Sequence, residues 1–197
     1  MNEHRLEPDN TKPTPRAESR FSARQLAMLG LMTAVLCILA PFSIPLPLSP
    51  VPISLTNFVI FLSLYILGTR YSLICYAVYL LIGLAGVPVF SNFSGGAAKL
   101  LGPTGGYLFG FLFLIPITGS ILYRWGHHRV IAAGGMLLGH LVCCLFGTIW
   151  LAYQAHMGFG AALFSGVILF IPGDVIKILA AVLIGPELQT RLKFLRN

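Results

Sequence analysis

The chain alternates between long apolar stretches and shorter polar, proline-rich or glycine-rich segments. A helix needs about 20 mainly apolar residues to cross a bilayer, and six stretches approach that length with almost no charge. We therefore predict an all-α integral membrane protein with six membrane-spanning helices. Two small-residue pairs, Gly106 with Gly110 and Gly135 with Gly139, favour close helix packing. The spans are expected at residues 25–41, 53–67, 72–87, 105–123, 130–153 and 161–184.

The spans divide the chain into three parts. Residues 1–24 are polar and rich in Pro and Arg, and they are longer than the charged start of a secretory signal. We predict that they form an uncleaved, disordered cytoplasmic tail. Residues 25–185 are expected to form the six-helix membrane domain, and residues 186–197 a basic cytoplasmic tail.

Composition and charge narrow the class of protein further. Only 10% of the residues are charged and 56% are hydrophobic, whereas a soluble domain is about 25% charged. The net charge of +7 could indicate a nucleic-acid partner, but the basic residues lie at the ends of apolar stretches. With a cytoplasmic N-terminus, eleven of the 13 Lys and Arg residues fall on the cytoplasmic side. The positive-inside rule therefore predicts that both termini are cytoplasmic.

Two uncharged or weakly charged segments are then expected to face outward. Residues 41–52 contain five prolines and no charge, which predicts a stiff apolar loop that covers something. Residues 87–104 are long and glycine-rich. Irregular backbone at membrane depth is tolerated where it lines a cavity. We expect this second loop to approach the cavity that holds the buried acid described next.

Asp174 and Lys177 lie inside the last apolar stretch, and Asp174 is the only acid between Glu18 and Glu187. Each charge costs about 2.5–3.5 kcal/mol at a bilayer centre, so such a pair must be compensated. Three residues along a helix place the two side chains on neighbouring ridges. They would form either an ion pair that holds helices together or a site for a polar ligand. A cyclic urea fits a ligand site, because the carboxylate accepts from N–H groups and the ammonium donates to a carbonyl. Pro172 and Gly173 are expected to bend the helix just before the pair.

Other candidate residues point less directly to a function. His140 has no acid near it in sequence, so packing or an interface role is the favoured interpretation. Trp150 falls near a span end, where it belongs to an aromatic belt or walls a pocket. The chain has no HExxH, GxSxG or CxxC motif, so the sequence predicts neither an enzyme nor a metal site. The four cysteines are expected to be buried free thiols: Cys37, Cys75, Cys143 and Cys144.

Three strings resemble the BioY family, the biotin-specific substrate-binding (S) components of energy-coupling factor (ECF) transporters. They read GPTGGY at residues 102–107, GTIWL at 147–151 and FIPGDVIK at 170–177, and the resemblance covers residues 25–185. It implies a six-helix bundle in the bacterial inner membrane that captures biotin from outside. It also implies a transmembrane scaffold (T) component and a pair of ATPase (A) subunits as partners. The chain itself lacks a Walker motif.

The resemblance also suggests roles for particular residues. Asp174 and Lys177 match the Asp and Lys that contact the ureido ring in the family, which agrees with the hydrogen-bond argument above. The glycine-rich loop resembles a further binding element, in which Asn92 or Ser94 contacts the ligand. The first span carries Gly30 and Ala34 in the small-x-x-x-small spacing that faces the scaffold. The complete set of predicted binding residues is Asp174, Lys177, Asn92, Ser94, Gly95, Gly96, Tyr107 and Trp150.

The sequence therefore predicts an S component that binds biotin as its transported ligand and needs no cofactor and no nucleic acid. Three alternatives stay open. The chain could serve another vitamin, such as thiamine or riboflavin, with the same fold. A small integral membrane enzyme would need more polar residues within the spans than this chain has. A passive pore would conduct without a partner and without saturable binding.

Overall fold

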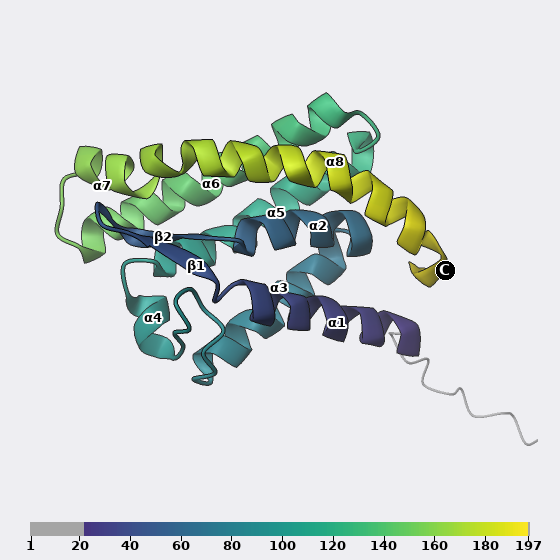
Figure 1. The fold of residues 1–197 in the computed structure, drawn as a ribbon, viewed down its shortest axis with the longest axis horizontal. Helices are drawn as coiled ribbons and strands as arrows, with labels where there is room; N and C mark the ends of the chain where they lie inside the picture. Colours follow the sequence, from purple (N-terminus) through teal and green to yellow (C-terminus); the bar gives the residue numbers. More distant parts are fainter. Residues whose placement is uncertain (1–21, 197) are drawn as a thin grey trace, which may run out of the picture.

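Residues 22–196 are described in the computed structural model, and they form a bundle of helices with a small hairpin at one end (Figure 1). The predicted tail of residues 1–24 therefore lies largely outside the described residues. The hairpin and the short helix α4 lie at one end of the bundle, which we call the hairpin end. The turns between α2 and α3 and between α5 and α6 lie at the other end, which we call the turn end.

Three short apolar helices form the first half of the bundle. They are α1 (Ala23–Leu39), α2 (Thr56–Leu67) and α3 (Thr69–Leu84). The backbone N–H of Ser22 donates to Gln25 Oε1 at 3.1 Å, which satisfies one polar group at the start of α1. Between α2 and α3 only Gly68 intervenes. Its φ of +78° lies in a region that suits glycine, so the chain reverses there without a linker.

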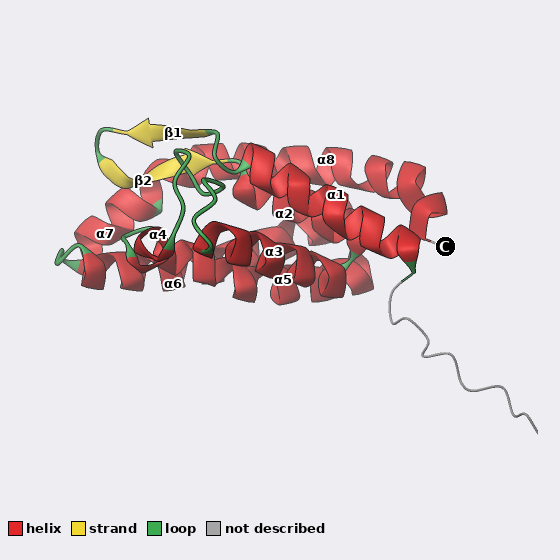
Figure 2. Ribbon diagram, turned by 90° about the horizontal axis from the view of Figure 1, so that it is seen from below, coloured by secondary structure: helices red, strands yellow, loops and turns green. Residues whose placement is uncertain are grey.

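The proline-rich segment forms a hairpin, which corrects the prediction of an all-α protein with a loop at residues 41–52. Strand β1 (Ser43–Leu46) pairs antiparallel with β2 (Ser49–Ser54), with Ile44 opposite Ile53. A two-stranded ribbon has two edges, and each strand turns alternate N–H groups away from its partner. Proline at such positions costs no ladder hydrogen bond, which explains how a proline-rich strand pairs at all. Figure 2 shows the hairpin lying across its end of the bundle.

Two long antiparallel helices pack closely against each other in the second half. Helix α5 (Gly105–Trp125) follows the short α4 (Ala97–Leu101), and α6 (Arg129–Gln154) returns alongside α5. Their contact depends on glycines, because an added Cβ would collide with a neighbour on the facing helix at each of four positions. The four glycines are Gly106, Gly110, Gly135 and Gly139. Their contacts confirm the predicted small-residue packing.

The last apolar stretch is interrupted rather than bent. It consists of α7 (Phe159–Gly166), a short 3₁₀ turn η1 (Ile168–Phe170) and α8 (Ile171–Arg196). The break falls at Val167, before the bend predicted at Pro172 and Gly173. Pro172 instead lies in the first turn of α8, where a missing N–H costs no helix hydrogen bond. Asp174 is consequently in the first turn of a new helix.

By length and composition, three helical segments are sufficient to cross a membrane, and they span Gly105–Trp125, Arg129–Gln154 and Phe159–Leu192. The helices α1, α2 and α3 are apolar but shorter. Large apolar side chains point outward around the bundle, including Leu31, Ile149 and Leu183, each more than half exposed. The buried interior holds aromatic residues such as Tyr76, Tyr79 and Phe61. An apolar exterior of this kind suits a lipid environment.

Candidate functional site

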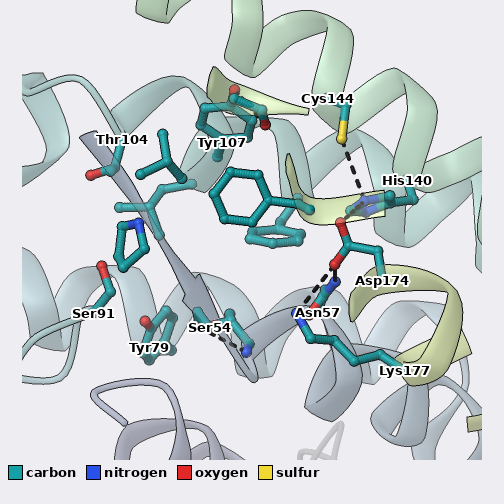
Figure 3. A pocket seen from close by; sticks show the side chains of 17 residues that line it. Ser54, Asn57, Tyr79, Ser91, Thr104, Tyr107, His140, Cys144, Asp174 and Lys177 are labelled. Carbon is teal, nitrogen blue, oxygen red and sulfur yellow. Dashed lines mark hydrogen bonds and ion pairs between the residues drawn. The ribbon is translucent and has the colours of Figure 1, made fainter. Parts of the chain in front are cut away.

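A cavity at the hairpin end of the bundle is lined by four of the ten buried polar or charged residues in the described part of the chain, namely Thr56, Asn57, Thr104 and Asp174. Its walls come from β2, α2, α3, α5, α6, α7, η1 and α8, with Ser91 from the loop between α3 and α4 and Thr104 from the turn before α5. Figure 3 shows an ionic cluster at one end of this cavity and the hydroxyl groups of Ser91 and Thr104 at the opposite end. Aromatic side chains, among them Tyr107, lie between the two ends.

The ionic cluster is centred on the carboxylate of Asp174, and both of its oxygen atoms are engaged. Oδ1 accepts from Asn57 Nδ2 at 2.9 Å and from Lys177 Nζ at 3.1 Å. Oδ2 lies 2.9 Å from His140 Nε2. The side chains of Asp174, Lys177 and His140 are each only 12–13% exposed. The carboxylate is thus held by three donors from three different helices.

The local structure explains why an acid is tolerated here. Asp174 lies in the first turn of α8, where the free N–H groups and the helix dipole favour a negative charge. Lys177 is three residues further along the same helix, so the spacing brings the two side chains together as predicted. Both residues line the cavity rather than the lipid-facing surface.

Sequence reasoning missed two members of the cluster. The prediction of a packing or interface role for His140 was wrong, because α6 places it against an acid 34 residues away in sequence. Asn57, at the start of α2, was not singled out, and it lies 117 residues from its partner. Neither contact leaves a periodic or spacing signal in the sequence. The one available hint was that a buried acid needs more than one donor.

The cluster retains capacity for a ligand. A carboxylate has about four acceptor sites, and three of those on Asp174 are used. The ammonium of Lys177 has three N–H donors, of which one is directed at Asp174. The site therefore offers a free acceptor beside free donors. That pattern matches a small group in which an N–H lies next to a carbonyl.

The opposite end of the cavity is neutral and hydroxyl-rich. Thr104 is 7% exposed, and its Oγ1 is buried without a hydrogen-bond partner among the described residues. Ser91 lies close by on the loop, half-buried. Tyr107 forms part of the wall, where its hydroxyl donates to the Gly166 carbonyl at 3.1 Å and its ring packs on Gly147. Thr104 directly precedes the first turn of α5, so its hydroxyl stands beside the positive end of that helix.

The loop predicted to approach the cavity does so through Ser91 and not through the residues named from sequence. Asn92 turns toward the hairpin, and its Oδ1 accepts from Ser43 Oγ at 2.8 Å. Ser94 Oγ donates to the Ser91 carbonyl at 2.6 Å, which shapes the turn.

Gly95 packs on the Val87 carbonyl, so any side chain would collide there. Gly96 likewise lies outside the cavity lining, where its N–H donates to the Gly83 carbonyl. The four predicted loop residues therefore support the fold of the loop, and Ser91 replaces them in the cavity wall.

Three further predicted residues, Trp150, Gly30 and Ala34, also lie outside the cavity lining. Trp150 packs over Gly106, and its Nε1 donates to the Gly102 carbonyl at 3.0 Å, so it anchors the turn before α5. Gly30 and Ala34 lie on the exposed face of α1, and nothing comes within 4 Å of the position of a Cβ at Gly30. That face is available to a neighbouring helix.

Comparison with known proteins identifies the family. The sequence profile described as the BioY family matches residues 12–194. The chain belongs to the BioY family. A relative named biotin transporter BioY, from Thermotoga maritima, is 39% identical over 166 residues, which cover 84% of this chain and 96% of that protein. A probable biotin transporter BioY from Pyrococcus horikoshii is 36% identical over 169 residues, covering 86% and 98%.

The fold agrees with this assignment. A crystal structure described as the S-component for biotin from an ECF-type ABC transporter superposes with a TM-score of 0.79 at 34% identity. The match covers 85% of this chain and 91% of the other. The chain is thus a mostly helical membrane protein with the fold of an S component. The relatives named above are described as transporters, and the structural neighbour as a transporter component.

Proposed function

We propose that this BioY protein is the biotin-binding S component of an ATP-driven ECF importer. The observation that carries the proposal is the buried Asp174–Lys177 pair, which lines a cavity and keeps an unused acceptor beside unused donors. A pair that served only to hold helices together would not need to face a cavity. The proposal requires no cofactor, metal or nucleic acid.

The ureido ring of biotin fits the ionic cluster. Its carbonyl would accept from the free N–H groups of Lys177, and one ring N–H would donate to the remaining acceptor site of Asp174. Asn57 and His140 hold the carboxylate from the other sides, so its position is set before the ligand arrives. A preorganised site of this kind loses less side-chain entropy on binding.

The valerate chain would then run along the aromatic wall toward the hydroxyl-rich end. There the carboxylate of the ligand would accept from Thr104 Oγ1, which has no partner, and from Ser91. This orientation separates the negative charge of the ligand from Asp174. It also supplies a partner to a buried hydroxyl that lacks one.

In the proposed topology all six apolar segments span the bacterial inner membrane, with both termini in the cytoplasm. Helix α2 has 12 residues and is about 18 Å long at 1.5 Å per residue, which is less than the hydrocarbon thickness of about 30 Å. The hairpin that precedes α2 would cover the remaining depth. Its residues Val51, Pro52 and Ser54 line the cavity, and this is the situation in which irregular backbone is tolerated at such depth.

Delivery of biotin would depend on a transmembrane scaffold component and ATPase subunits. The exposed face of α1 with Gly30 and Ala34 is the proposed contact with the scaffold. We expect Ala34→Trp to abolish co-purification with the scaffold and ATP-driven uptake, because the bulky ring prevents close helix approach. Biotin affinity of the isolated protein should remain unchanged. A variant that still assembles would place the scaffold contact elsewhere.

Ligand identification tests the proposed function directly. Mass spectrometry of the detergent-purified protein should find biotin bound, and calorimetric titration should show saturable binding of biotin but not of thiamine or riboflavin. Tight binding of one of the other vitamins would identify a different S component. Flux through proteoliposomes that contain this chain alone, without saturable binding, would instead favour the passive pore.

A further inference from the structure

A second polar cavity lies at the turn end of the bundle, away from the proposed biotin site. It has a volume of about 530 Å³ and is enclosed by the adjoining ends of α2, α3, α5, α6 and α8. Arg129, His127, Thr69 and Gln189 contribute polar groups, while Leu64 and Leu122 provide apolar walls. Within the described part of the chain, no acidic residue lines it. The cavity is therefore polar and positively charged.

The wall of this cavity includes a buried hydroxyl that lacks a partner. Tyr65 is 3% exposed, its ring packs on Gly185, and its hydroxyl has no hydrogen-bond partner among the described residues. An unsatisfied buried hydroxyl costs about 1–3 kcal/mol. Arg129 lines the same cavity as Tyr65. The cavity wall thus carries both a guanidinium and a phenol O–H, and the phenol has no acceptor among the described residues.

The start of α6 adds to the positive potential. This helix has 26 residues and begins at Arg129, and the preceding His128 provides no side-chain cap for its first N–H groups. The uncompensated N–H groups and the helix dipole favour an anion there. Two acids occur within residues 22–196, and neither neutralises Arg129. Asp174 lies in the other cavity, and Glu187 pairs with Arg191 at 2.8 Å.

We propose that this cavity binds the phosphate group of an anionic membrane lipid. An Arg side chain, a phenol donor and a helix N-terminus are the groups that bind phosphate oxygens. The surroundings favour a lipid over free phosphate, because Tyr123 and Val130 beside the cavity are 90% and 85% exposed and would lie at the membrane surface. The bound phosphate would connect the turn before α6 to α2.

This site is independent of biotin binding, and its test therefore has a separate readout. The full-length protein would be purified in neutral detergent and titrated with short-chain phosphatidylglycerol or phosphatidylcholine, with binding followed by native mass spectrometry. We expect phosphatidylglycerol to bind in preference to phosphatidylcholine. Inorganic phosphate at millimolar concentration should not displace it. Displacement by inorganic phosphate would overturn the lipid assignment in favour of a soluble phosphate compound.

Matched variants test the residues. Arg129→Gln should weaken phosphatidylglycerol binding about tenfold, because a charge-assisted contact contributes on that scale. Tyr65→Phe removes one oxygen atom and should weaken it about threefold while leaving the fold intact. Arg124→Gln removes the same charge from the neighbouring exposed end of α5 but does not touch the cavity, so it should have no effect.

Thermal unfolding of each variant in detergent serves as the folding control, and its midpoint should not be lowered. Unchanged lipid binding in both Arg129→Gln and Tyr65→Phe would overturn the proposal. An equal loss in Arg124→Gln would also overturn it, since the effect would then reflect the net charge of the surface. None of these outcomes depends on whether biotin is the transported ligand.

Discussion

Asp174 at the hairpin end and Arg129 at the turn end differ in how their charges are compensated. The carboxylate of Asp174 is buried and accepts from three donors, two of them supplied by other helices. Arg129 is exposed at the mouth of its cavity, and no acid among residues 22–196 lies beside it. A buried charge must be compensated within the fold, because water is absent there. A charge at the surface can instead be compensated by an ion that binds from outside the protein.

The two ends should therefore respond differently to ligand and to mutation. Binding at Asp174 completes a hydrogen-bond network that is already largely formed. Loss of any one donor should therefore weaken the remaining hydrogen bonds as well. Binding at Arg129 would supply a missing counter-charge and should depend on salt. The predictions below test this contrast at the hairpin end, in order of decreasing effect on biotin affinity.

Asp174→Asn should lower biotin affinity at least about 30-fold, equivalent to about 2 kcal/mol, because Lys177 is left buried without its counter-charge. Isothermal titration of the purified variant measures the change. Glu187→Gln is the matched control, since it removes the other described acid from an exposed pair that contributes little. Unchanged biotin affinity in Asp174→Asn would show that Asp174 is not part of the biotin site.

His140→Leu should lower biotin affinity about tenfold, because Oδ2 of Asp174 loses its donor and the carboxylate is free to reorient. His140→Gln retains an N–H donor and should recover most of the affinity. Titration of the two variants side by side separates hydrogen bonding from packing. If His140→Leu and His140→Gln lowered biotin affinity equally, His140 would act through the packing of its side chain and not through a hydrogen bond.

Thr104→Val should lower affinity for biotin about fivefold and leave affinity for biotin methyl ester unchanged. The reason is that the lost hydroxyl is the proposed donor to the carboxylate of the ligand. Competition binding with both compounds provides the measurement. Equal losses for acid and ester would indicate that the valerate chain runs elsewhere.

Trp150→Phe should leave biotin affinity unchanged and lower the stability of the protein by about 1 kcal/mol, which corresponds to the loss of one hydrogen bond to the Gly102 carbonyl. Thermal unfolding in detergent, followed by titration with biotin, distinguishes the two effects. A marked loss of biotin affinity at unchanged stability would indicate that Trp150 contacts the ligand.

The sequence alone located the helices and the central pair of charges. Apolar stretches and glycine spacing are local properties, so five of the six predicted spans agree with observed helices to within three residues, whereas the sixth is divided between α7, η1 and α8. Asp174 and Lys177 are one helical turn apart, and any helix would bring them together. The hairpin was missed because proline argues against a strand unless its N–H faces away from the partner, which depends on register.

Only the tertiary structure decided the rest of the site. Asn57 and His140 reach Asp174 because α2, α6 and α8 pack around one point, and their sequence separations of 117 and 34 residues carry no local signal. The choice of Ser91 over Asn92 and Ser94 depends on how the loop folds against the hairpin. Helix formation is governed by neighbours in the chain, whereas the partners of a buried charge are governed by neighbours in space. The sequence therefore determined which charge required a site, and the packing determined which residues complete it.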